Sequence, residues 1–190
     1  LDDSYIATST LKKFICNNRV VRLTKPYIDG NVKNVVIYRD IEISTSTVLI
    51  KREALHKVGG FDEKLPRRQD IQLFVQLFRH GKLKLLSEHL TNMDVSDGNN
   101  RKFNPSSIRE MEELFFNSIR NELNEYSRFK RIGIKRIYNF ESGICLIHSG
   151  YKIQGIKMCL PILFHPVLLI KQMKRKKRQI YEKANGVEKR

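Results

Sequence analysis

Apolar residues with helical spacing occur in two stretches of this chain, and each stretch predicts an amphipathic helix. The first helix is expected to begin near Arg68, after Pro66, and to end at His80-Gly81. Its apolar positions fall at i, i+3, i+4 and i+7, which is one face of an α-helix: Ile71, Phe74, Val75 and Phe78. We therefore expect this face to lie in a hydrophobic core.

The second stretch opens with Asn104 as a side-chain cap and Pro105 at the first helical position. Glutamates follow in the early turns, where the positive end of the helix dipole favours negative charge. A continuous apolar stripe runs through Ile108, Met111, Phe115, Ile119, Leu123 and Tyr126. The stripe predicts one uninterrupted helix of about 20 residues.

Two segments between residues 40 and 90 have the composition of β-strands. Residues 44–50 are rich in Ser, Thr, Val and Ile and predict a buried strand. Residues 82–90 alternate in part and predict a second strand. Residues 52–58 predict a short helix that Gly59 ends in a left-handed conformation. The adjacent Gly60 permits a further unusual backbone angle or the close approach of a ligand.

The ends of the chain have weaker patterns. Residues 11–23 mix apolar and basic positions without a clean period, and residues 32–38 fit either a helix or a strand. A polar loop at residues 96–102 is the best candidate for a boundary. Beyond the second amphipathic stretch we expect three further helices, two of them short, at residues 134–148, at residues 153–160, and from Pro166 onward.

Composition allows one domain with an appendage and indicates an anionic partner. The 190 residues are 41% hydrophobic, and 36 Lys and Arg against 20 acids give a net charge of +16. Residues 171–178 hold six cations in eight positions, and residues 128–136 form a second cluster. Three interpretations stay open: a solvated helix face, an anionic membrane surface, or nucleic acid, the least expected. Near an anionic bilayer each cation contributes roughly 1 kcal/mol.

Several classes of site and segment are not indicated. The three cysteines, Cys16, Cys145 and Cys159, lack metal or redox spacing and are typical of reduced thiols in a cytoplasmic protein. The first residues do not have the basic-then-apolar pattern of a signal peptide. The longest apolar run, residues 160–170, is shorter than the roughly 20 residues of a spanning helix. The histidines have no ligand spacing, and no phosphate-loop, dinucleotide-binding or hydrolase motif occurs.

The most informative residues are Val58-Gly-Gly-Phe-Asp-Glu-Lys-Leu-Pro-Arg-Arg-Gln-Asp70, followed directly by the first predicted helix. With residues 43–50 before them, they resemble the C-terminal half of the catalytic domain of family 2 glycosyltransferases. The resemblance implies an α/β fold: residues 1–100 as a partial GT-A (Rossmann-like) domain without its nucleotide-binding half, and residues 101–190 as a basic α-helical extension. It also favours a helix at residues 32–38.

Members of this family are inverting enzymes, and the resemblance implies roles for single residues. Asp70, in a Gln69-Asp70 pair, corresponds to the base that takes the proton of the acceptor hydroxyl. The loop beside the donor sugar corresponds to Gly59, Gly60 and Asp62, with Phe61 expected in the core. Arg67 and Arg68 are expected to keep Asp70 charged and to face the donor's phosphates. Two alternatives stay open: an aspartate that only stabilises a helix start, and a glycine pair that only ends a helix.

The resemblance further implies a nucleotide-sugar donor, a saccharide or lipid-linked acceptor, and a role in cell-surface polysaccharide biosynthesis. It implies a divalent metal, Mg²⁺ or Mn²⁺, whose ligands the sequence does not identify; Asp2 and Asp3 are candidates for a remnant of the metal motif. We expect a peripheral protein on the inner face of the plasma membrane, and a half-domain that does not turn over alone. The alternatives are an inert remnant and a basic binding module.

Overall fold

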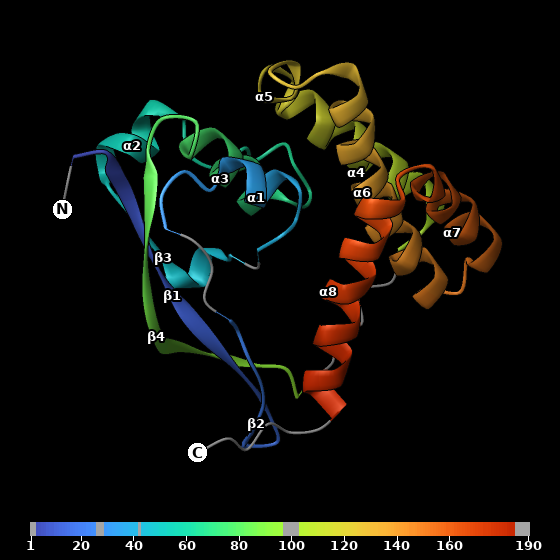
Figure 1. Ribbon diagram of the computed structural model, residues 1–190, viewed down its shortest axis with the longest axis horizontal. Helices are drawn as coiled ribbons and strands as arrows, with labels where there is room; N and C mark the ends of the chain where they lie inside the picture. The colour runs from blue at the N-terminus through green and yellow to red at the C-terminus, as the bar shows by residue number, and fades with distance from the viewer. Residues whose placement is uncertain (1–2, 26–28, 42, 97–102, 185–190) are drawn as a thin grey trace. The chain divides into compact units, whose positions relative to one another are not determined.

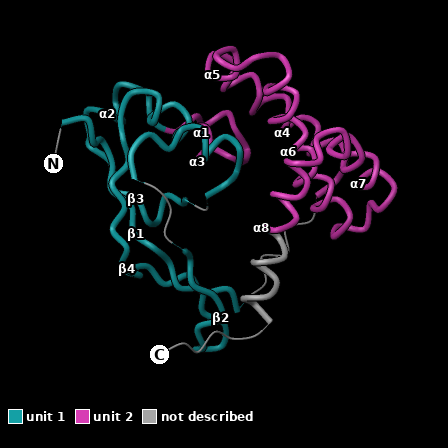
Figure 2. The backbone as a smooth tube through the Cα atoms, in the orientation of Figure 1, with its two compact units in different colours: residues 1–60, 73–99, 175–190 teal, residues 61–72, 100–174 magenta. Residues whose placement is uncertain are grey.

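The computed structural model describes residues 3–25, 29–41, 43–96 and 103–184, which form a mixed α/β structure (Figure 1). The chain divides into two compact units, coloured separately in Figure 2. Unit 1 comprises residues 1–60, 73–99 and 175–190, and unit 2 comprises residues 61–72 and 100–174. The loop that carries most of the expected site residues therefore belongs with the helices that follow residue 100.

The sheet of unit 1 is built around one long strand, β1 (Tyr5–Cys16). Strands β2 (Arg19–Leu23) and β3 (Val48–Ile50) pair antiparallel with it, and β4 (Lys82–Asp94) pairs parallel with it along most of its length. The sheet is therefore mixed, with β1 inside and β4 at one edge. Strand β4 extends four residues beyond the predicted strand at residues 82–90.

A tight hairpin joins β1 to β2, in a region whose sequence has no clean period. Asn17 and Asn18 both have positive φ, 48° and 61°, and Cys16 faces Arg19 in the register. Two consecutive left-handed residues match the twist of the flanking strands, and asparagine tolerates this conformation better than most residues. The Asn-Asn pair therefore places the turn.

One face of β1 contributes to the core of unit 1. Ala7, Ser9 and Leu11 are buried at alternate positions, as a half-buried strand requires. The register against β4 shifts between Leu11 and Lys12, and Lys12 is buried as well. Its backbone N–H donates to Thr24 Oγ1 at 2.6 Å, and its ammonium donates to Ser44 Oγ at 3.4 Å.

Three helices accompany the sheet: α1 (Lys33–Ile37), α2 (Arg52–Lys57) and α3 (Gln69–Leu77). They confirm the helices expected at residues 32–38 and 52–58 and the helix expected to begin near Arg68. The unit 1 part of α3 lies on the same side of the sheet as α1 (Figure 1). Leu73, Phe74, Val75, Leu77 and Phe78 are all fully buried, so this part is surrounded by apolar contacts rather than buried on one face only.

The strand predicted at residues 44–50 is wrong in extent and in burial. Residues Thr45–Thr47 form a 3₁₀ turn, η1, and only Val48–Ile50 pair with β1. Thr47 Oγ1 donates to the Ser44 carbonyl at 2.8 Å, and its N–H donates to the same carbonyl at 3.0 Å. Hydroxyl side chains compete in this way with strand pairing. Leu49 is 78% exposed, because it points away from the covered face.

Unit 2 is helical and contains α4 (Pro105–Ser118), α5 (Arg120–Asn124), α6 (Arg128–His148), α7 (Lys152–Cys159), the 3₁₀ helix η2 (Leu160–Phe164) and the first half of α8 (Pro166–Ala184). The expected cap is present: Asn104 Oδ1 accepts from the Ser107 N–H at 2.8 Å. The single helix predicted after it is wrong, because Ile119 leaves helical geometry with ψ of 23° and separates α4 from α5. The expectation of two short helices among the last three is also wrong: α6 and α8 have 21 and 19 residues.

Helices α6 and α7 cross at a pair of glycines. A Cβ on Gly143 would lie 2.6 Å from the Gly155 carbonyl oxygen, and a Cβ on Gly155 would lie 2.5 Å from the Gly143 oxygen. Atoms at that separation overlap, so only glycine fits at both positions. The two backbones therefore approach one another more closely than side chains would permit.

Candidate functional site

The Gly59-Gly60 pair ends α2 in unit 1 with a Schellman motif. The Gly60 N–H donates to the Leu55 carbonyl and the Gly59 N–H donates to the His56 carbonyl, both at 3.1 Å. The glycines have φ of 79° and 75°, as the sequence predicted for Gly59. No atom lies within 4 Å of where a Cβ would stand on either glycine. The requirement for glycine is therefore conformational, and the space beside this backbone is open.

The loop that follows, in unit 2, is held by its own polar residues. Asp62 Oδ1 accepts from the Lys64 N–H at 3.0 Å, and the Asp62 carbonyl accepts from the Leu65 N–H. Gln69 Nε2 donates to the Leu65 carbonyl at 2.7 Å, and Leu65 is buried. Asp62, expected beside the donor sugar, and Gln69, expected to bind substrate, thus fix the loop. Phe61, which we expected in the core, is 47% exposed.

Asp70 lies in the first turn of α3 and is half-buried. Its Oδ1 accepts from the Ile71 N–H at 2.9 Å. Within the described part of the chain no other group pairs with this carboxylate, so the arginines expected to keep it charged do not contact it. A carboxylate has about four acceptor positions. The remaining acceptor positions of the Asp70 carboxylate can therefore accept a hydrogen bond from the hydroxyl of a bound molecule.

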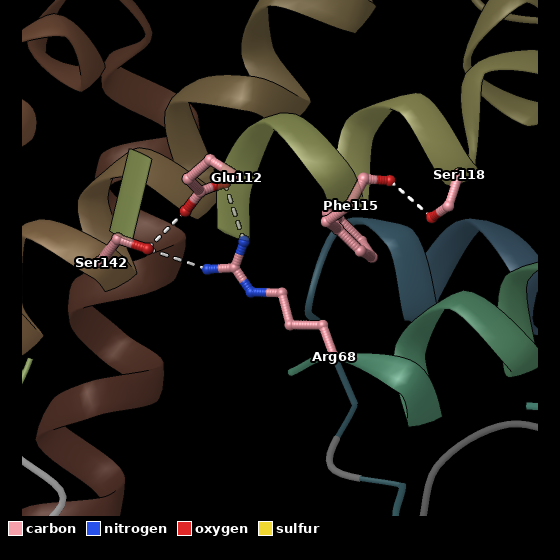
Figure 3. A network of polar contacts seen from close by, with 5 residues as sticks. All are labelled: Arg68, Glu112, Phe115, Ser118 and Ser142. Carbon is pink, nitrogen blue, oxygen red and sulfur yellow. Dashed lines mark hydrogen bonds and ion pairs between the residues drawn. The ribbon is translucent and has the colours of Figure 1, made fainter. Parts of the chain in front are cut away.

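Arg68 is the centre of a buried polar network in unit 2 (Figure 3). Its Nη1 lies 2.8 Å from Glu112 Oε2 on α4, and its Nη2 donates to Ser142 Oγ on α6 at 2.9 Å. Ser142 Oγ in turn donates to Glu112 Oε1. The guanidinium also lies 4.7 Å from the ring centre of Tyr138. Arg68 therefore ties the loop to two helices, with one hydrogen bond from its guanidinium to each.

The backbone of Arg68 has φ of +65°, a left-handed conformation that is uncommon for residues other than glycine. Such a conformation costs of order 1 kcal/mol or more and persists only where surrounding contacts determine it. The ion pair to Glu112 supplies those contacts. The strained residue lies two positions before Asp70, so the network holds the backbone directly before the first turn of α3.

An open depression of about 290 Å³ lies beside Arg67 in unit 2. The Arg67 guanidinium is 4.4 Å from the ring centre of Phe103, which packs against a buried cluster that includes Met111. The lining residues are Lys64, Pro66, Arg67, Phe103, Ser107, Glu110, Met111 and Leu114. An aromatic ring beside charged groups suits a ligand with both apolar and polar surface. No sequence pattern indicated that Phe103 belongs to this place, because 36 positions separate it from Arg67.

The ligands of the divalent metal that the resemblance implies were not identified from the sequence. Among the described residues no group of three or more His, Cys, Asp and Glu side chains comes together. Asp2 lies outside the described residues, and Asp3 is an exposed partner of Lys51, with Nζ and Oδ1 3.8 Å apart. Mg²⁺ in proteins is usually held by one or two carboxylates, with waters and substrate phosphates as the other ligands. We therefore derive no step that passes through a metal.

A further polar pair, in unit 1, lies at the start of β4. Lys84 Nζ lies 2.6 Å from Asp29 Oδ2, and the Leu85 N–H donates to Asp29 Oδ1 at 2.7 Å. The hydrogen bond from Lys84 is the main cause that lowers the pKa of Asp29, and the same bond raises the pKa of Lys84. The pair fixes the chain before α1 to the sheet.

Comparisons of this chain with protein-family models, with curated proteins and with solved structures gave no match.

Proposed function

We propose that this chain contributes the acceptor side of an inverting glycosyl transfer from a nucleotide-sugar donor to a saccharide or lipid-linked acceptor, with Asp70 as the base. The observation that carries the proposal is the segment from Val58 to Phe78. Its sequence resembles family 2 glycosyltransferases. Its fold supports that resemblance with a left-handed glycine pair, a self-held loop and an aspartate in the first helical turn.

In this proposal Asp70 accepts a hydrogen bond from the acceptor hydroxyl. As the hydroxyl oxygen attacks the anomeric carbon, the bond from that carbon to the diphosphate oxygen breaks. The proton passes to Asp70, and the nucleoside diphosphate leaves with the electron pair. Attack from the side opposite the leaving group inverts the anomeric centre. The step requires a carboxylate within hydrogen-bonding reach of the acceptor hydroxyl, and Asp70 offers one in the first turn of α3.

The proposal gives Arg68 a positioning role instead of the expected contact with phosphates. Its guanidinium already donates to Glu112 and Ser142. A contact with a diphosphate would first have to break this buried pair, which is strongly unfavourable. Arg68 therefore holds the loop so that Asp70 stands at the start of α3, whereas a role for Arg67 at the donor phosphates stays a prediction.

The test is the release of nucleoside diphosphate from a panel of nucleotide sugars by the 190-residue chain, with Mn²⁺ and simple saccharide acceptors. Binding of the same donors and of the saccharide acceptors is measured by calorimetry. Because the resemblance implies a half-domain that does not turn over alone, we expect the wild type to bind an acceptor, and any release of nucleoside diphosphate to fall at least about 100-fold in Asp70→Asn, the usual contribution of a general base. Glu63→Gln, which neutralises an exposed acid in the same loop, is the matched control.

Unchanged release by Asp70→Asn would refute the role of Asp70. If a chain shown by circular dichroism to be folded binds no saccharide acceptor, it does not contribute the acceptor side of the proposed transfer.

A further inference from the structure

Apolar side chains face the solvent along α7, η2 and the start of α8 in unit 2. Most of them are three or four residues apart, and two are adjacent: Ile156, Leu160, Leu163, Phe164, Val167 and Ile170. Phe164 and Val167 are each 76% exposed. Large apolar side chains scattered singly over a surface need no explanation, but a run of neighbours marks an interaction site. We call these six residues the apolar run.

The start of α8 has its polar and apolar residues in unusual places. Gln172 is buried, with 1% of its surface exposed, whereas Ile170 and Met173 on either side of it are more than half exposed. Water favours the opposite arrangement. The outward face of α8 therefore has the composition of a surface that meets something other than water.

Aromatic contacts at the junction of η2 and α8 hold the centre of the apolar run in place. The ring of Phe129, at the start of α6, stacks on His165 with the ring centres 4.6 Å apart, and Phe129 is itself exposed. Arg136 lies 2.6 Å from His165 Nδ1, and its guanidinium is 5.4 Å from the ring centre of Phe164. Two exposed phenylalanines and an arginine are thus gathered around one buried histidine.

The charge around the apolar run is predominantly positive. Residues 127–175 contain ten Lys and Arg and a single acid, Glu141. Lys157, Lys171 and Lys174 are exposed on the helices that carry the run. Lysine stems lie along apolar surface while the ammonium stays in a polar layer. Apolar contacts surrounded by cations match the boundary of an anionic bilayer, where acyl chains lie beneath phosphate groups.

From these observations we infer that α7, η2 and the start of α8 form a surface that binds an anionic lipid bilayer at its interface. Phe164 and Val167 lie below the headgroups, and Lys171 and Lys174 contact the phosphates. Within the described residues no helix has the length and apolar character needed to cross a bilayer. A second copy of the chain fits this surface poorly, because two faces of the same charge would repel. The inference does not depend on the role of Asp70.

The first experiment is flotation of the full chain with vesicles of phosphatidylcholine alone or mixed with phosphatidylglycerol. We expect binding only to the anionic vesicles, reduced at least about tenfold by the pair Lys171→Gln and Lys174→Gln. The pair Arg52→Gln and Lys57→Gln removes the same charge from an exposed helix of unit 1 and is the matched control. Equal binding to neutral and anionic vesicles, no binding, or an equal loss in both pairs would overturn the inference.

The second experiment measures insertion and uses the absence of tryptophan from the chain. In Phe164→Trp the only indole lies in the apolar run, and its emission should shift to the blue and be quenched by brominated lipid. In the control, Leu49→Trp, the indole lies on the sheet of unit 1 and should stay in water. Vesicle-bound Phe164→Trp protein with unshifted emission would overturn the inference. So would a blue shift without vesicles that rises with protein concentration, or one produced by nucleic acid instead of lipid.

Discussion

Arg68 and Glu112 form an ion pair between the loop before α3 and the middle of α4, with side chains only 11% and 9% exposed. Forty-four positions separate them. Since burial removes both charges from water, removing one partner leaves the other charge buried without compensation.

Replacing either partner alone should therefore destabilise unit 2. We expect Arg68→Met and Glu112→Gln each to cost about 3 kcal/mol, because each leaves a buried group without its partner. The measurement is the free energy of unfolding in urea, followed by circular dichroism.

The double variant Arg68→Met with Glu112→Gln is the informative control, since it removes both charges. It should be less destabilised than the sum of the single variants, so that a double-mutant cycle gives a coupling of more than about 1 kcal/mol. If the losses of stability in the two single variants simply add in the double variant, the two charges do not stabilise one another.

A side chain at Gly59 or Gly60 should strain the end of α2. Gly59→Ala and Gly60→Ala are each expected to cost roughly 1 kcal/mol, because an L side chain at positive φ is unfavourable although space is available. Gly59→Asn should cost less, since asparagine tolerates the left-handed region. Urea unfolding measures all three, and an alanine variant as stable as the wild type would rule out this source of strain.

The crossing of α6 and α7 should not tolerate a methyl group. Gly143→Ala and Gly155→Ala place a Cβ against the opposite carbonyl oxygen, so we expect a loss of about 1–3 kcal/mol for each. Lys135→Ala, at an exposed position of α6, is the control and should be close to neutral. Thermal unfolding compares the three variants. A Gly155→Ala chain with the same melting temperature as the wild type would show that α6 and α7 can move apart to accept a methyl group without loss of stability.

The Asp29–Lys84 pair should make unit 1 sensitive to acid. The pKa of Asp29 is lowered on folding, so its contribution to stability is present above the unfolded pKa of about 3.9 and is lost as the pH falls through the lower folded value. The urea midpoint should therefore fall less between about pH 5 and pH 3 in Asp29→Asn than in the wild type. Lys84→Gln removes the hydrogen bond that is the main cause of the lowered pKa of Asp29, so it should also reduce the dependence of the urea midpoint on pH. Parallel acid profiles in all three chains would exclude the pair as the source.

Features that depend on neighbours a few positions away were already specified by the order of the residues. The cap at Asn104, the left-handed Gly59 and the start of α3 near Arg68 were all predicted, because each is made by hydrogen bonds within about one helical turn. The Asn17-Asn18 hairpin belongs to the same class, although the mixed pattern around it concealed its strands. The position of Asp70 in the first turn of α3 also follows from local pattern alone.

The packing of the folded chain settled which distant residues meet. The apolar stripe after Asn104 is continuous, yet the helix breaks at Ile119. A stripe shows which residues are buried, but it does not show whether a single straight helix can bury all of them. Arg68 was expected at a phosphate and is instead paired with Glu112, and Phe103 lies against Arg67 without any signal in the sequence. A charged side chain binds whichever partner the packing brings within reach, and the choice of partner is a property of the assembled helices.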